Sequence, residues 1–63
     1  MSRWISLTHR PQGKLEEQSS ESASQRDDGA MVVFYLRRED DIEIAFKCLR
    51  YPSGEETDWQ QFR

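Results

Sequence analysis

The feature that most constrains this chain is the run at residues 31–51, MVVFYLRREDDIEIAFKCLRY, which holds most of the apolar content in a third of the length. Its first six residues are rich in β-branched and aromatic side chains, which favour a strand that needs a partner. An acidic stretch at residues 39–41 interrupts the run. The run therefore predicts either two strands that fold back on each other at the acidic stretch or a strand followed by a helix.

The second half of the run fits two periodicities. As a helix over residues 41–51, it places apolar side chains at i, i+3, i+4 and i+7, with acids at its start and cations near its end. As a strand, it alternates apolar and polar side chains. The helix would also be apolar on most of its sides, which a chain of 63 residues is too small to surround. We expect an antiparallel hairpin of strands at about 31–38 and 42–50, with the helix as the alternative.

The register of this hairpin decides which side chains share a face. With residues 39–41 as a three-residue loop, Arg37 faces Glu43 on an amphipathic face and the other face is apolar. A two-residue loop shifts the pairing by one residue and sorts the side chains less well. A three-residue loop usually requires Gly or Asn at a positive φ, and only Asp is present here. We predict the three-residue loop, with an apolar face that consists of Val32, Phe34, Leu36, Ile42, Ile44, Phe46 and Cys48.

The N-terminal half of the chain is less apolar. Residues 3–9, RWISLTH, predict a short third strand. Residues 10–30 hold few apolar side chains and four serines between positions 19 and 24. Such a segment buries too little apolar surface to offset the entropy lost on ordering. We therefore predict an N-terminal strand within residues 1–9 and a flexible Ser/acid-rich connector at residues 10–30.

The C-terminal residues contain a helix signal. Ser53 is followed three residues later by Glu56, which is the signature of a capping box. A helix over about 54–62 would carry Trp59 and Phe62 on one side, and it must dock on the hairpin because it is too short to be stable alone. The predicted fold is one small α+β domain, in which residues 31–63 supply the hairpin and the short helix.

Composition and charge exclude several classes of function. The formal net charge is −3, whereas a general nucleic-acid binder normally shows a basic excess. Cys48 is the only cysteine, so we expect a buried, unpaired thiol in a reducing compartment. No apolar segment approaches 18 residues, and the first 14 residues lack a secretory apolar region. We expect a cytoplasmic protein that does not bind membranes.

Enzymatic chemistry has no support in the sequence. His9 is the only histidine, and no neighbouring pattern indicates groups that would orient it as a base. Ser, His and Asp residues occur without a nucleophile-elbow motif. The acids at residues 39–41 lack the ligand spacing and the glycine of an EF-hand loop. We predict no catalytic residue, no metal ion and no cofactor.

Protein–protein interaction is the function that the sequence favours. A domain of this size forms a marginal core, so we expect the sheet to be completed by another protein or by a second copy of the chain. Aromatic and arginine side chains dominate interface energetics, and an exposed strand edge can pair with a partner's strand. We predict a non-enzymatic regulatory or inhibitory protein. The predicted partner-binding residues are Trp4, Tyr35, Arg37, Arg38 and Trp59, although for Trp59 a core position that caps the hairpin is favoured over a contact role.

Single-stranded nucleic acid is the alternative ligand. Tyr35 together with Arg37, Arg38 and Lys47 resembles an aromatic and basic platform on which bases stack. The acidic side chains at residues 39–41 would repel phosphate. We therefore rank nucleic acid below a protein partner.

Overall fold

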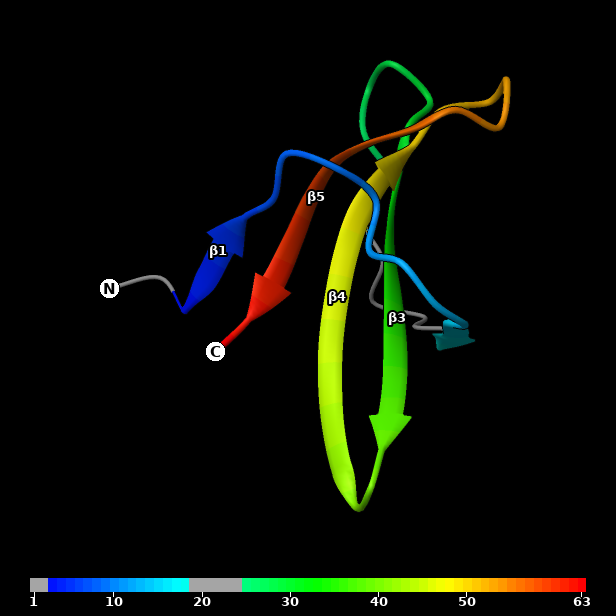
Figure 1. Cartoon of the computed structure of the whole chain (residues 1–63). Coiled ribbons are helices and arrows are strands. Elements are labelled where there is room, and N and C mark those ends of the chain that lie inside the picture. The colour runs from blue at the N-terminus through cyan, green and yellow to red at the C-terminus, as the bar shows by residue number, and fades with distance from the viewer. Residues whose placement is uncertain (1–2, 19–24) are drawn as a thin grey trace.

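The computed structural model describes residues 3–18 and 25–63, which form a single antiparallel sheet (Figure 1). The strand order is β1-β5-β4-β3-β2. This part of the chain contains no helix, and so none that is long and apolar enough to cross a membrane. The predicted α+β class is therefore wrong, and the described fold is all-β. The strands are β1 (Trp4–Ser6), β2 (Glu16–Gln18), β3 (Met31–Glu39), β4 (Ile42–Arg50) and β5 (Glu56–Phe62).

The central hairpin of β3 and β4 is present, but with a different turn from the predicted one. Glu39 pairs with Ile42, so the turn consists of two residues, Asp40 and Asp41. Both have positive φ, at 46° and 68°. Two such residues make a type I′ turn, whose twist matches that of the strands, and Asp is among the few non-glycine residues that tolerate this conformation. The predicted three-residue loop and the alternative helix over 41–51 are both wrong.

The shorter turn exchanges the two faces of β3, because a slip of one residue turns every side chain over. Tyr35 pairs with Phe46, and Val33 pairs with Cys48. The odd-numbered residues of β3 therefore share a face with the even-numbered residues of β4, and we call this the inner face. Val32, Phe34 and Leu36, which were predicted on the apolar face with Phe46, lie on the opposite, outer face. The buried cluster of the inner face consists of Val33, Tyr35, Phe46, Cys48 and Trp59.

Strand β5 replaces the helix that was predicted over residues 54–62. The backbone N–H of Tyr51 donates to the carbonyl of Glu55, and that of Gly54 donates to the carbonyl of Tyr51, both at 2.8 Å. Of the two capping-box residues, Ser53 thus lies in the turn between β4 and β5, and Glu56 is the first residue of β5. The physical reason is that a strand at the second edge of β4 pairs a row of main-chain groups there, which a docked helix would leave without main-chain partners.

A β-bulge explains why alternation was not recognisable in β5. The register between β4 and β5 shifts by one residue between Lys47 and Leu49. Asp58 and Trp59 together oppose a single residue of β4, and Asp58 has a φ of 56°. The extra residue places Trp59 on the inner face together with Glu56, which strict alternation would not allow.

The inner face is covered by residues 7–15, which cross the sheet from β1 at one edge to β2 at the other (Figure 1). The backbone N–H of Leu7 donates to the carbonyl of Trp59 at 2.8 Å, and Leu7 and Leu15 pack against the buried cluster. We call residues 7–15 the crossing segment. Strand β1 lies within residues 3–9, where the sequence predicts a short strand. The connector predicted at residues 10–30 contains β2 and most of the crossing segment, and its serines at 19–24 lie outside the described residues.

Candidate binding surface

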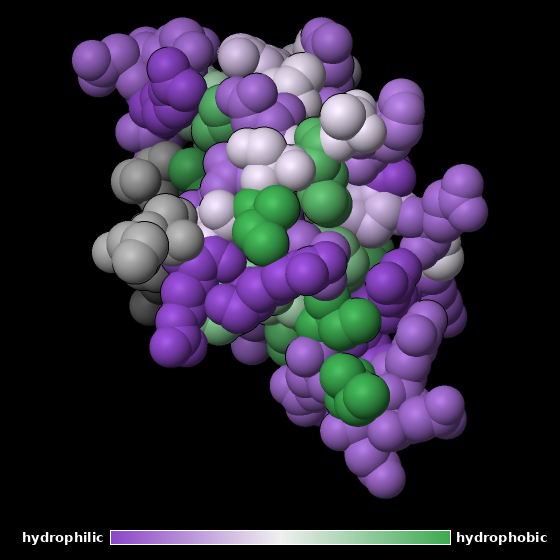
Figure 2. Space-filling view, turned by 60° about the vertical axis from the view of Figure 1, so that its left-hand side comes forward, coloured by the Kyte–Doolittle hydropathy of each residue, from purple (hydrophilic) through white to green (hydrophobic). Residues whose placement is uncertain are grey.

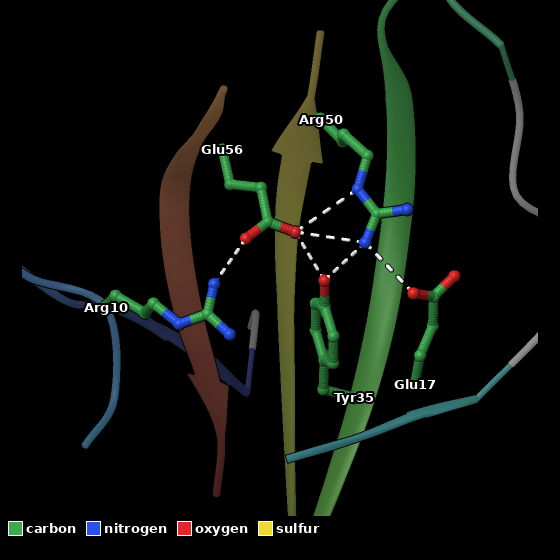
Figure 3. A network of polar contacts seen from close by, with 5 residues as sticks. All are labelled: Arg10, Glu17, Tyr35, Arg50 and Glu56. Carbon is green, nitrogen blue, oxygen red and sulfur yellow. Dashed lines mark hydrogen bonds and ion pairs between the residues drawn. The ribbon is translucent and has the colours of Figure 1, made fainter. Parts of the chain in front are cut away.

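A polar network fastens one end of the inner face (Figure 3). The Tyr35 hydroxyl donates to Oε2 of Glu56, while Nη2 of Arg50 donates to the Tyr35 oxygen at 2.6 Å and to Glu56 at 3.1 Å. Arg50 also bonds Glu17 at 3.0 Å, and Arg10 bonds Glu56 at 2.6 Å. The five side chains come from the crossing segment and from four of the strands, so the network ties distant parts of the chain together.

The network shifts the pKa values of three of its members, Tyr35, Arg50 and Glu56. Burial alone would raise the pKa of Glu56, but hydrogen bonds from Tyr35 and Arg50 and the charge of Arg10 lower this pKa overall. Burial, followed by the hydrogen bond to Glu56, raises the pKa of Tyr35 to about 12. The hydrogen bond to Glu17 is the largest cause of the raised pKa of Arg50. Each charge in the network has a partner, so the arrangement is suited to holding strands together rather than to moving protons.

Cys48 is the small buried side chain that the sequence predicts. Its thiol is unpaired, and the residue is only 2% exposed. Burial raises the pKa of Cys48 to about 12, so the thiol stays protonated and unreactive near neutral pH. Residues 3–18 and 25–63 contain no group of three or more His, Cys, Asp or Glu side chains that could hold a metal ion.

Two of the predicted partner-binding residues lie in the core. Tyr35 and Trp59 are each 5% exposed, and their ring centroids are 5.4 Å apart. The prediction of an exposed Tyr35 ring is wrong, because the two-residue turn directs this side chain inward. The core position that the sequence favours for Trp59 is the observed one.

The basic residues that were predicted to act beside Tyr35 do not converge on one surface. Arg37 lies on the inner face, with its guanidinium 5.2 Å from the centroid of the Phe46 ring. Arg38 lies on the outer face and forms a 2.9 Å ion pair with Glu43. Lys47 is also on the outer face. It lies two positions along β4 from Ala45, which pairs with Leu36 of the same face. These positions, together with the buried Tyr35, do not form the flat platform that base stacking requires.

Trp4 is the predicted contact residue that meets other aromatic rings on the outer face. Its ring centroid lies 5.1 Å from that of Phe62 and 6.2 Å from that of Phe34. The ammonium of Lys47 lies 4.3 Å from the centroid of the Trp4 ring. These four residues come from β1, β3, β4 and β5, and we call them the outer aromatic cluster. Phe34 and Phe62 were missed as members because their positions depend on the turn and on the bulge.

The outer aromatic cluster belongs to a larger apolar surface. A shallow hollow beside it is bordered by apolar and polar side chains of three strands and by Arg26 from the loop before β3. The described segments outside the strands either cross the inner face or lie at the ends of strands (Figure 1). The half-buried apolar side chains of the outer face, besides Trp4 and Phe34 of the cluster, are Val32, Leu36, Ala45 and Leu49.

No protein-family model, no curated protein and no solved structure matches this chain. The functional proposal below therefore depends on the chain's own surfaces.

Proposed function

We propose that this protein is a small non-enzymatic regulator or inhibitor that binds another protein through the outer face of its sheet. One observation carries the proposal: the rings of Trp4, Phe34 and Phe62 meet on the face that the crossing segment does not cover. Aromatic side chains of this kind supply the largest contributions to interfaces, because they bury much apolar area with little loss of conformational entropy.

The chemistry of the outer face also supports a protein as the partner. A sheet face with half-buried apolar side chains can pack against the apolar face of a helix or of a second sheet. Lys47 lies within the aromatic cluster, where its charge favours a partner that brings a carboxylate. The ion pair between Arg38 and Glu43 lies toward the edge of the same face, in the manner of a polar rim.

The inner face supports the non-enzymatic part of the proposal. Its candidate acid–base groups are engaged with one another, and the pKa values of both Tyr35 and Cys48 are raised to about 12. Neither group would exchange a proton readily near neutral pH. The proposal places the protein in the cytoplasm, where a single unpaired cysteine is ordinary.

Two serine variants with equal exposure test the role of the outer face. Phe62 is 42% exposed on the outer face, and Ile5 is 43% exposed on β1, where it pairs with Gln61. Affinity capture from cell extract, quantified by mass spectrometry, would compare wild type, Phe62→Ser and Ile5→Ser. We expect Ile5→Ser to capture the same proteins as wild type in similar amounts. The amounts captured by Phe62→Ser should be lower by at least about tenfold, which corresponds to about 1.4 kcal/mol of binding energy.

Light scattering of the purified proteins completes the test. A wild-type dimer that Phe62→Ser converts to monomer would identify a second copy of the chain as the partner. Equal capture by the two variants, with no change in mass, would contradict binding through the outer face. Urea unfolding of both variants verifies that each remains folded at the temperature of the capture.

A further inference from the structure

The β3–β4 hairpin projects beyond the rest of the sheet (Figure 1). Strand β2 pairs with β3 only as far as Leu36, and β5 pairs with β4 no closer to the turn than Phe46. Residues 37–44 therefore form a two-stranded arm. Neither side of this arm has a neighbouring strand among the described residues.

The β4 side of the arm carries an alternating pattern. Ile42 and Ile44 point to the inner side of the arm, and Glu43 points to the outer side, where it pairs with Arg38. Ile42 is 61% exposed. At the end of the molecule formed by the turn, a hydrophobic side chain stands out among charged ones (Figure 2). An open strand edge and an exposed apolar side chain thus occur together.

The main chain of Glu43 is available to a partner. The two residues that flank a two-residue turn exchange both of their hydrogen bonds, and the direction of the main-chain groups then alternates along each strand. Glu39 and Ile42 flank this turn. The N–H and C=O of Glu43 consequently face away from β3, toward the open side of the arm.

We infer that the β4 side of the arm accepts a strand of a partner protein with the pattern apolar–basic–apolar. The basic residue lies opposite Glu43 and exchanges two main-chain hydrogen bonds with it, while the apolar residues lie beside Ile42 and Ile44. The bound strand continues the line of β5. This inference goes beyond the proposed function by adding a second contact surface and the chemistry of its partner segment, and it rests on the proposed function only in taking the partner to be a protein.

A second copy of the chain fits this edge less well than a basic strand. Antiparallel pairing of two β4 edges about Glu43 would place the two Glu43 carboxylates directly opposite each other, which destabilises a strand pair. Asp40 and Asp41 at the turn add further negative charge. The same charges attract a strand that carries lysine or arginine.

Two synthetic peptides test the inference on the full chain. One alternates valine and lysine, and its matched control alternates valine and glutamate. Binding is followed by NMR titration of the isotope-labelled protein and by hydrogen exchange of the Glu43 amide. We expect the lysine peptide to bind about tenfold more tightly than the glutamate peptide and to slow exchange at Glu43. Equal affinities, or peptide-induced changes confined to the outer aromatic cluster, would overturn the inference.

Two further controls separate charge from strand pairing. The double variant Arg38→Glu with Glu43→Lys keeps the ion pair of the arm and should reverse the preference between the peptides. N-methylation of the central lysine removes one main-chain hydrogen bond and should weaken binding several-fold; unchanged binding would contradict strand addition. The Phe62→Ser variant should bind the lysine peptide as wild type does. Failure of the arm and failure of the outer face are therefore distinguishable.

Discussion

The two faces of this sheet are built by the same strands, yet they differ in how far the rest of the described chain covers them. The inner face is covered by the crossing segment and holds the buried residues of the core. The outer face carries three aromatic rings in contact, together with half-buried aliphatic side chains, and no described segment crosses it. Apolar content alone therefore does not determine which face of a small sheet becomes the core.

The neighbours Phe34 and Tyr35 show why the inner face, and not the outer face, became the core. A buried tyrosine needs a hydrogen-bond partner for its hydroxyl, whereas phenylalanine has no polar atom to satisfy. The inner face offers Glu56 and Arg50 to Tyr35, and the same carboxylate binds Arg10 of the crossing segment. The polar network thus anchors the cover of the inner face, whereas no described segment crosses the outer face.

The largest expected effect comes from truncating one phenylalanine on each face. Phe46 is 1% exposed at the centre of the inner face, and Phe34 is half-buried on the outer face. Phe46→Ala should lower the free energy of unfolding by about 3–5 kcal/mol through lost burial and an unfilled cavity. Phe34→Ala should lower it by less than about 1.5 kcal/mol. Urea unfolding followed by circular dichroism measures both values, and equal losses would show that the outer face is also part of the core.

An intermediate effect is expected from neutralising one carboxylate on each face. Glu56→Gln keeps the side-chain shape but removes the charge that binds Arg10 and Arg50, and it should reduce the free energy of unfolding by about 3 kcal/mol. Glu43→Gln breaks the exposed ion pair with Arg38, and this variant should reduce the free energy of unfolding by less than about 1 kcal/mol.

The acid side of the pH profile sharpens this second test. The folded-state pKa of Glu56 is lowered, so its contribution is present above the unfolded pKa and is lost as the pH falls through the folded pKa. The stability of wild type should therefore fall more steeply in acid than that of Glu56→Gln. Parallel profiles would contradict the coupling of Glu56 to folding.

Much of the central hairpin could be predicted because local signals and strand pairing agree. The β-branched and aromatic residues at 31–36 favour a strand, and the acidic stretch at 39–41 marks the turn. The register could not be predicted in the same way. The odd-numbered and the even-numbered residues of β3 both include apolar side chains. Which of the two sets faces the core therefore depends on the backbone conformation of Asp40 and Asp41, which composition does not reveal.

The C-terminal strand and the aromatic cluster were beyond prediction for a related reason. Trp59 and Phe62 are spaced like neighbours on a helix face, but in the sheet Trp59 is on the inner face and Phe62 contacts Trp4 on the outer face. The bulge at Asp58 interrupts the period of two that identifies a strand. Membership of the outer cluster depends on pairings between residues that are far apart in the chain, such as Trp4 with Phe62.

The smallest expected effect is an alkaline loss of stability that arises on the inner face. Burial raises the pKa of Cys48 from 9.0 to about 12 and that of Tyr35 from 10.0 to about 12. A raised folded-state pKa contributes stability that is complete below the unfolded pKa and is lost as the pH rises toward the folded value. Linkage gives a loss of about 2 kcal/mol between pH 8 and pH 10, most of it from Cys48.

The matched variant for this loss is Cys48→Ala, which removes the group that titrates first. It lowers stability at every pH through the lost sulfur, so the informative quantity is the change between pH 8 and pH 10, measured by urea unfolding at each pH. We expect this change to shrink to about 0.4 kcal/mol, the part contributed by Tyr35. If the change in Cys48→Ala equalled that of wild type, the alkaline loss would have to come from groups other than Cys48. Burial of this thiol would then not be what couples protonation to folding in this pH range.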